Sequence, residues 1–241
     1  MSKISALFFD LDETLMDFDE EAYYMVVTGV CEALADRFPS IDAQRLKGAY
    51  EPLNRARWSG AIGGGAPPDD GRSGLNIWRA VWRDALASIG CHDSAAVNDV
   101  TETYVQARRQ AYRLFEDVRA TLDQLRGCYR LAVITNGPAD TQLDKLEVTG
   151  LAPYFDAVVA SGAVGAAKPN PQIFRHALRS LGVEPAAVWH TGDSLPSDVA
   201  GALNAGLTAV WLNRDGTRRD VTHPTPHHEI TSLTELLELL P

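Results

Sequence analysis

Residues 4–17 read ISALFFDLDETLMD, and this stretch predicts both the architecture and the place of a functional site. Its first six residues, Ile4–Phe9, are mostly apolar and bulky, which is typical of a strand buried on both faces inside a parallel sheet. The apolar run ends at Asp10. Ligands bind beyond the carboxyl ends of the strands in an open α/β sheet, so Asp10 falls where a site is expected.

A second acid, Asp12, follows two positions later. If the chain stays extended there, Asp10 and Asp12 project to the same side and share a small volume. Two like charges this close are tolerated when one takes up a proton or a cation bridges them, and an all-oxygen site suits magnesium. Asp10 is therefore a candidate nucleophile toward phosphorus, and Asp12 a candidate proton carrier. The alternative is that both acids merely end a strand and decorate a loop.

The composition excludes several classes of partner. The chain has 241 residues and a formal net charge of -10, which argues against general affinity for a nucleic acid polymer or an anionic membrane. No apolar run approaches the ~20 residues that span a bilayer, and we expect no signal peptide, since the first predicted strand begins at Ile4. We therefore expect a cytoplasmic protein, monomer or homodimer, that acts on a small molecule.

The segment from Asp17 to Leu114 has a helical pattern. Three of its four expected helices begin after Asp19, after Asp42 and near Ile77, and Ser94 is expected to cap the fourth, which runs to about Leu114. Pro52 is expected to kink or end the second helix. The stretch Ser59–Gly74 is rich in Gly and Pro, and we expect a flexible loop there rather than a cradle for phosphate.

From Phe115 onward, strand and helix patterns alternate. Strands are expected at 129–134, 157–160, 187–191 and 208–212, with helices at 118–125, 139–149, 171–181, 197–204 and 233–240. Alternating units of this kind imply an α/β fold with a mostly parallel sheet and helices on both faces. The expected division is a core of residues 1–16 and 115–241, and an inserted helical domain of residues 17–114 that could close over the site as a lid.

Polar side chains follow four of the predicted strands, and together they make a set suited to phosphoryl transfer. They are Asp10 with Asp12, Thr135 with Asn136, Lys168, and Asp193. Asp10, Asp193 and the main-chain carbonyl of Asp12 could hold Mg²⁺. The Thr135 hydroxyl, a nearby backbone amide and the Lys168 ammonium could bind the phosphoryl oxygens. Behind this set, Ser194 and Asp198 are candidates for support, with Asp198 bracing Lys168 or a water on the metal.

Four segments carry a resemblance to a known family: FFDLDETL (8–15), ITNG (134–137), AAKPNPQIF (166–174) and TGDSLPSD (191–198). In this order and spacing they resemble the signature motifs of the haloacid dehalogenase superfamily of aspartate-nucleophile hydrolases. The resemblance implies a Rossmann-like core with a helical cap inserted after the first motif. Carried over by position, it implies a nucleophile at Asp10, a general acid/base at Asp12, phosphate binding by Thr135, Asn136 and Lys168, and a further metal ligand at Asp193.

Asp12 separates two branches of this superfamily. The dehalogenases lack an acid at this position because a halide leaves without a proton, whereas an alkoxide needs one. Its presence therefore favours a phosphatase. Residues 135–159 and 203–216 resemble most the branch that contains pyrimidine nucleotidases and N-acylneuraminate phosphatases.

The leading hypothesis is a Mg²⁺-dependent phosphatase that acts on a nucleoside monophosphate or a sugar phosphate through an aspartyl-phosphate. A phosphomutase or a dehalogenase of the same superfamily is the alternative. A phospho-accepting signalling switch is a more distant one, since such modules place the phosphorylated Asp on a later strand and carry no helical insert. Histidines 223, 227 and 228 are expected in a polar loop, and His190 as a packed, hydrogen-bonded imidazole in a strand.

Overall fold

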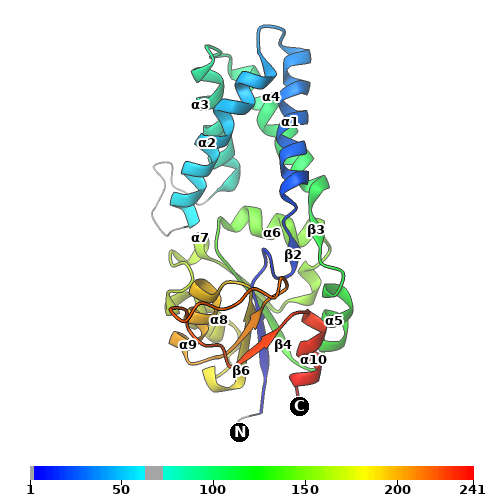
Figure 1. The fold of residues 1–241 in the computed structure, drawn as a ribbon, viewed down its shortest axis with the longest axis vertical. Helices are drawn as coiled ribbons and strands as arrows, with labels where there is room; N and C mark the ends of the chain where they lie inside the picture. Colours follow the sequence, from blue (N-terminus) through cyan, green and yellow to red (C-terminus); the bar gives the residue numbers. More distant parts are fainter. Residues whose placement is uncertain (1–2, 63–72) are drawn as a thin grey trace. The chain divides into compact units, whose positions relative to one another are not determined.

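The computed structural model describes residues 3–62 and 73–241 (Figure 1). The chain divides into two compact units. We call Met1–Asp17 with Arg113–Pro241 the sheet unit, and Phe18–Tyr112 the helical unit. Among the described residues, no helix has the length and apolar character needed to cross a membrane.

The sheet unit is built on six strands in the order β5-β4-β1-β6-β7-β8, and each neighbouring pair is parallel. The predicted α/β fold class is therefore confirmed. The strands span Ala6–Phe9 (β1), Arg130–Thr135 (β4), Ala157–Ala160 (β5), Val188–Gly192 (β6), Thr208–Leu212 (β7) and His228–Ile230 (β8).

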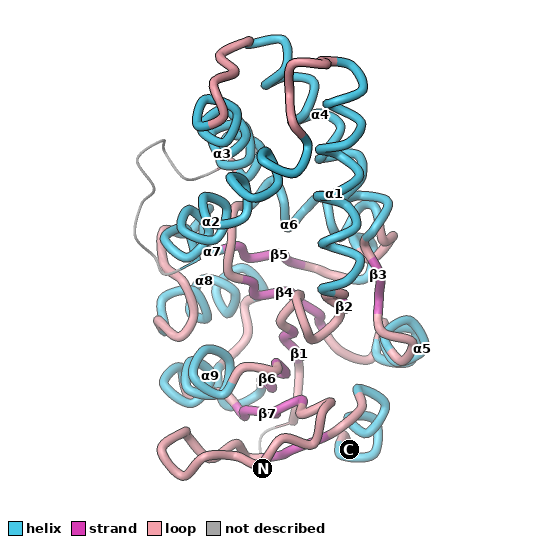
Figure 2. The backbone as a smooth tube through the Cα atoms, turned by 45° about the horizontal axis from the view of Figure 1, so that its top comes forward, coloured by secondary structure: helices cyan, strands magenta, loops and turns pink. Residues whose placement is uncertain are grey.

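The strand β1 lies in the middle of the sheet because both of its faces are apolar. All four of its residues are buried. Ala6 and Phe8 belong to the core cluster that contains α8, and Leu7 and Phe9 alternate to the opposite face. Figure 2 shows α8 and α9 on one side of the sheet and α5 on the other. Burial of each large side chain contributes roughly 1.5–3 kcal/mol to the free energy of folding. A shift of this strand by one residue would move these side chains to the opposite faces of the sheet, so its register is strongly specified.

Helices connect the parallel strands, and one more helix, α10, follows the last strand. They span Val118–Leu125 (α5), Ala139–Val148 (α6), Ser161–Val164 (α7), Pro171–Leu181 (α8), Ala200–Ala205 (α9) and Leu236–Leu239 (α10). The bounds of α8 agree with the sequence prediction because both end signals are strong. The Asn170 side chain accepts a hydrogen bond from the Gln172 N–H, and Gly182 ends the helix in the left-handed conformation.

The helical unit consists of α1 (Glu20–Arg37), α2 (Ala43–Ile62), α3 (Gly74–Ser88) and α4 (Ser94–Ala111). Its core is aromatic. The Tyr50 ring stacks on Trp82 with centroids 3.8 Å apart, and Tyr104 packs edge-on against both rings. This face holds the helices together, since such ring pairs add to the burial of large apolar areas.

Two predictions for the helical unit are wrong in part. The helix α2 runs through Pro52 instead of ending there, because the proline is on the exposed face while Leu46 and Tyr50 on the buried face hold the helix in place. The predicted loop Ser59–Gly74 is helical at its start, since α2 reaches Ile62, and Gly74 already begins α3. The remainder of that loop, residues 63–72, lies outside the described residues.

Three further boundaries differ from the sequence prediction. The cap of α4 is Asp93 rather than Ser94, because the Asp93 carboxylate accepts the Ala95 N–H. The same helix ends at Ala111, and Arg113–Leu114 (β3) instead pairs antiparallel with Met16–Asp17 (β2). His228 belongs to β8 instead of a loop, and its ring stacks on Trp189. Strands this short leave no periodic pattern in a sequence.

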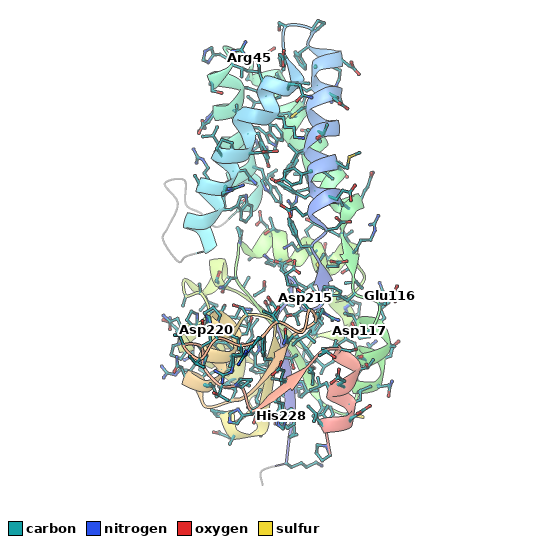
Figure 3. All side chains as sticks on the ribbon, viewed as in Figure 1. Arg45, Glu116, Asp117, Asp215, Asp220 and His228 are labelled. Carbon is teal, nitrogen blue, oxygen red and sulfur yellow. The ribbon has the colours of Figure 1, made fainter. Side chains whose placement is uncertain are left out.

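Asp117 directly precedes α5 but serves another purpose than capping it. Its carboxylate makes no cap hydrogen bond to that helix and instead accepts hydrogen bonds from Nη1 and Nη2 of Arg214, at 2.9 and 3.0 Å. Arg214 also donates to the main-chain oxygen of Thr14, at 2.9 Å. Asp117, labelled in Figure 3, thus helps to fix the turn that follows Asp12.

Candidate active site

The polar residues that follow β4, β1 and β6 gather at one edge of the sheet, because these three strands are neighbours and run parallel. Asp10 comes directly after β1, and its N–H donates to the Thr191 carbonyl of β6 at 2.9 Å. Thr135 is the buried last residue of β4, and Asp193 directly follows β6. At the carboxyl edge of the sheet, an acid therefore follows β1 and another follows β6, and a threonine hydroxyl ends β4.

Lys168 lies at the centre of this edge. Its Nζ is 2.5 Å from Asp10 Oδ1 and 2.7 Å from Asp198 Oδ1, and its side chain is 2 % exposed. Burial opposes the charge of this ammonium, but the Asp10 and Asp198 carboxylates outweigh it and raise the Lys168 pKa above its usual value. Lys168 is therefore a fixed positive charge against Asp10.

Asn136 holds the main chain of Lys168. Its Oδ1 accepts the Lys168 N–H at 2.8 Å, and its Nδ2 donates to the Lys168 carbonyl at 3.1 Å. The sequence predicts that Asn136 binds phosphate. The Asn136 side chain uses its oxygen and one of its two amide hydrogens in these bonds to Lys168. The second amide hydrogen can therefore be donated to a ligand.

Asp198 contacts Lys168 as well, which is one of the two roles that the sequence analysis offers for it. The segment Leu195–Val199 forms one π-helical turn that points Asp198 back toward β6. There it accepts hydrogen bonds from His190 Nε2 at 2.9 Å and from the Ser194 N–H at 3.2 Å. Burial opposes its ionisation, but Lys168 and then His190 lower the Asp198 pKa to about 2. His190 is packed and hydrogen-bonded as predicted.

Gly192 makes this arrangement possible. A Cβ atom at this position would lie 2.3 Å from Asp198 Cγ. No side chain fits into that distance, so the last residue of β6 must be glycine if Asp198 is to reach Lys168 and His190.

The edge carries more negative than positive charge. Carboxylate oxygens of Asp10, Asp193 and Asp198 lie within 4.8 Å of one another, and Lys168 is the cation in contact with two of them. Burial, and then the Asp198 charge, raise the pKa of Asp10 well above its usual range and the pKa of Asp193 to about 6. Hard oxygen ligands with excess negative charge fit a divalent cation such as Mg²⁺.

Asp12 has a different partner from Asp10. Both of its carboxylate oxygens lie 2.7 Å from Lys145 Nζ, and its side chain is 44 % exposed. Lys145 belongs to α6, is largely buried and also donates to Gln142 Oε1 at 3.2 Å. Gln142 in turn donates to the Asn136 carbonyl. Asp12 thus reaches solvent on one side while α6 holds it on the other.

Sequence reasoning did not identify Lys145 or Gln142. One signal was available, since the two residues are three positions apart and so share a face of the predicted helix, together with the buried Leu146. A lysine on the buried face of a helix needs a partner. The pairing of Lys145 with Asp12 joins residues 133 positions apart, so no local sequence pattern indicates it.

The structure brings together most of the residues predicted for the site. Asp10, Lys168 and Asp198 are in direct contact, and Asp193 joins Asp10 and Asp198 in the carboxylate group. Chemically, this arrangement offers a carboxylate next to a cation, a place for a metal ion and an accessible second acid. Such a set can move a group that carries negative charge.

Comparisons with known proteins agree with this chemistry. A model of the haloacid dehalogenase-like hydrolases matches residues 4–206. The N-acylneuraminate-9-phosphatase of Homo sapiens is 30% identical over 253 residues, which cover 100% of this chain and 95% of that protein. The pyrimidine 5'-nucleotidase YjjG of Escherichia coli (strain K12) is 31% identical, with 97% of this chain and 96% of that protein covered.

A solved structure is similar over nearly the whole chain as well. The 2-haloacid dehalogenase from Pseudomonas syringae pv. Tomato DC3000 superimposes with a TM-score of 0.74 at 30% sequence identity, covering 98% of this chain and 97% of that one. Proteins named for two different kinds of substrate, a phosphorylated compound and a 2-haloacid, are therefore similar to this chain.

Proposed function

Because the chain belongs to the haloacid dehalogenase-like hydrolases, we propose that it is a Mg²⁺-dependent phosphatase of a small phosphorylated metabolite, a nucleoside monophosphate or a sugar phosphate. The family membership confirms the resemblance carried by the four motifs. The observation that carries the proposal is the position of Asp10, directly after β1 with Lys168 Nζ 2.5 Å from its carboxylate. The phosphatases among the relatives support it.

In the proposed first step, an Asp10 oxygen attacks phosphorus, and the bond from phosphorus to the leaving oxygen breaks. Asp12 gives its proton to that oxygen, so an alcohol leaves and an acyl phosphate forms on Asp10. Lys168, the Thr135 hydroxyl and the free amide hydrogen of Asn136 bind the phosphoryl oxygens during the transfer. Asp198 is a positioning residue that keeps Lys168 in place.

In the second step, Asp12 is a carboxylate and takes a proton from water. The resulting hydroxide attacks phosphorus, the bond between phosphorus and Asp10 breaks, and inorganic phosphate leaves. A phosphomutase would return the group to a second substrate instead. The exposed side of Asp12 favours water as the acceptor.

Asp10 and Asp193, together with the Asp12 main-chain carbonyl, are the groups proposed to hold Mg²⁺. Asp198 belongs to the same carboxylate group, although its closest contacts are Lys168 and His190. When bound, the ion would supply positive charge against the phosphoryl oxygens.

The raised Asp193 pKa gives a prediction about Mg²⁺ and pH. A carboxyl group that titrates near 6 when folded, against 3.8 ordinarily, stabilises the metal-free fold fully below about pH 3.8. That stabilisation is lost as the pH rises through 6, where Mg²⁺ can replace the proton. In calorimetry, Mg²⁺ should therefore raise the Tm more at pH 7.5 than at pH 5. An equal rise at both values, or the same rise in Asp193→Asn, would contradict the assigned ligands.

Lys145 is proposed to hold Asp12 in position for both proton transfers. We expect Lys145→Met to lower kcat by about 10- to 100-fold and to leave KM for an aryl phosphate unchanged, because Lys145 contacts the acid instead of the phosphate. Lys145→Arg keeps the charge and should recover part of kcat. Steady-state kinetics measure kcat and KM for each variant. A higher KM in Lys145→Met with an unchanged kcat would instead assign Lys145 to substrate binding.

A phosphate-release screen over nucleotides, sugar phosphates and phosphorylated acids, with Mg²⁺ present, tests the proposed function. We expect release that requires Mg²⁺ and prefers one class of compound. No release from any ester, including p-nitrophenyl phosphate, would overturn the proposal.

Dehalogenation is the second candidate, because a 2-haloacid dehalogenase is among the similar structures at 30% identity. Halide release from L-2-chloropropionate distinguishes the two. We expect no halide release, since the proposed role of Asp12 is to protonate an alkoxide leaving group, and a halide leaves without a proton.

The assignment of the helical unit as a cap is also a proposal. It rests on the place in the chain where this unit is inserted, right after β1 and β2.

A further inference from the structure

Arg214 joins separate segments of the sheet unit. It comes shortly after β7, and its side chain is largely buried. Its Cζ atom lies 3.8 Å from the centroid of the Phe115 ring, and its Nη1 and Nη2 donate to the Asp117 carboxylate. Nη2 also donates to the Thr14 carbonyl at 2.9 Å. A planar guanidinium can hold these partners at the same time because its donors lie in a fixed fork.

The turn between β1 and β2 has an unfavourable backbone conformation. Glu13 lies in it with a φ of 61°, in the left-handed region that residues other than glycine seldom adopt. Such a conformation persists where the surrounding structure fixes it from several sides. Within the turn, the N–H groups of Leu15 and Met16 both donate to the Leu11 carbonyl. Arg214 donates to the turn from outside, at the residue directly after Glu13.

Thr14 connects this turn to Asp193. Thr14 is fully buried, and its hydroxyl donates to Asp193 Oδ1 at 3.4 Å. A buried hydroxyl needs an acceptor inside the protein, and here the acceptor is a proposed metal ligand. Thr14 accepts from Arg214 through its carbonyl and donates to Asp193 through its side chain. A shift of the Thr14 main chain would therefore change the contact with the Asp193 carboxylate.

The main chain of Asp193 is held separately. Trp211 of β7 donates its Nε1–H to the Asp193 carbonyl at 2.7 Å. Asp193 also directly follows β6, and the pairing of β6 with β7 extends to Gly192 and Trp211. Loss of the Arg214 contact would therefore leave the Asp193 main chain in place and alter the orientation of its carboxylate.

The charge of Arg214 does not favour a metal ion at the carboxyl edge. The Asp117 carboxylate pairs with this guanidinium through two hydrogen bonds and neutralises it. A positive charge close to a cation site would itself oppose binding of the cation. Arg214 can therefore promote metal binding only through the positions of Thr14 and Asp193.

We propose that Arg214 is a positioning residue for the metal site: it holds the Thr14 main chain, so that the Thr14 hydroxyl keeps the Asp193 carboxylate beside Asp10. This inference rests on the proposed function, in which Asp10 and Asp193 hold Mg²⁺. Removal of a group that orients a metal ligand typically weakens metal binding by about 10- to 100-fold.

Mn²⁺ is the probe for this role, because it takes the same oxygen ligands as Mg²⁺ and its unbound form is counted directly by electron paramagnetic resonance. The titration needs no substrate. We expect Arg214→Met to raise the Kd for Mn²⁺ about tenfold or more, and Asp193→Asn to raise it at least as much. An unchanged Kd in Arg214→Met would overturn the proposal. So would a lower Kd, which removal of a positive charge alone would give.

Arg214→Lys replaces Arg214→Met if the latter does not fold. It keeps a cation beside Asp117 and loses the fork that holds Asp117 and Thr14 together, so the same rise in Kd is expected.

A double-variant cycle tests whether Arg214 acts through Thr14. Thr14→Val keeps the shape of the side chain and loses its hydroxyl, so it should raise the Kd for Mn²⁺ about as much as Arg214→Met. The variant with both changes should bind no more weakly than Thr14→Val alone. Thr14→Ser keeps a hydroxyl and should bind as the wild type does. Effects that multiply in the double variant would show that Arg214 acts by another route, and would overturn the proposal.

Ser232→Ala is the matched control for a general loss of stability. The Ser232 hydroxyl donates to the same Asp117 carboxylate at 2.9 Å, and its removal leaves the bond between Arg214 and Thr14 intact. We expect a lower Tm in both Ser232→Ala and Arg214→Met, but a higher Kd for Mn²⁺ in Arg214→Met alone. An equal rise of the Kd in Ser232→Ala would assign the effect to stability and overturn the proposal.

Kinetics separate this inference from the proposed function. Arg214→Met should raise the Mg²⁺ concentration that gives the half-maximal rate, and leave KM for p-nitrophenyl phosphate at saturating Mg²⁺ unchanged. A higher KM with an unchanged Mg²⁺ requirement would overturn the inference. A protein that shows the expected Mn²⁺ binding but releases no phosphate from any ester would lose the proposed function and keep this inference, so the two fail separately.

Discussion

Replacing Asp10 with Asn is expected to lower kcat toward p-nitrophenyl phosphate by about ten-thousand-fold or more, because an amide cannot attack phosphorus. The shape of the side chain is kept, and Lys168 retains its contact with Asp198. The fold should therefore survive, and the Tm should stay near that of the wild type. Initial rates and circular dichroism melts measure both quantities on the same preparation.

Asp215→Asn is the matched control for this variant. Asp215 is exposed, belongs to the same unit and is labelled in Figure 3. It should turn over substrate as the wild type does. If Asp10→Asn retained more than about a tenth of the activity, a different residue would have to be the nucleophile.

Lys168→Met is expected to reduce both activity and stability. Removal of the ammonium leaves the buried carboxylates of Asp10 and Asp198 without the cation that contacts both. Breaking a buried ion pair in this way costs about 3–5 kcal/mol, and loss of one donor to the phosphoryl oxygens costs about a hundred- to a thousand-fold in kcat. Urea unfolding and steady-state kinetics measure the two effects.

The exposed Lys3 provides the control, as Lys3→Met removes a lysine from the same unit without a buried partner. Added Mg²⁺ should restore part of the stability of Lys168→Met, because it offsets the same negative charge. Unchanged stability in Lys168→Met would show that Asp10 and Asp198 need no countercharge, and the electrostatic account of the site would be wrong.

The sheet and the gathering of the site residues could be predicted from the sequence, since both depend on local signals. Buried strands are short apolar runs, and the functional residues come where those runs stop, as Asp10 does after Phe9 and Asp193 after Gly192. The parallel arrangement then brings the strand ends to one edge. The glycine after α8 and the Asn before it likewise act within one turn of the chain.

The features that could not be predicted depend on contacts between distant parts of the chain. Lys145 meets Asp12 across 133 positions, and Asn136 holds the Lys168 main chain across 32. Tertiary packing also overrides local preference, as it does where α2 continues through Pro52. Strand β8 has three residues, too few for an alternating pattern to be recognised.

The claim that Asp10 carries the phosphoryl group is tested most directly in Asp12→Asn, which keeps the nucleophile and loses the group that activates water. After brief incubation with p-nitrophenyl phosphate and Mg²⁺, the protein is quenched in acid, digested and analysed by mass spectrometry. We expect one phosphoryl group on the peptide that contains Asp10, at a yield close to one per chain, and none in the double variant that also carries Asp10→Asn. Release of p-nitrophenol by Asp12→Asn with no phosphoryl group on that peptide would contradict the account.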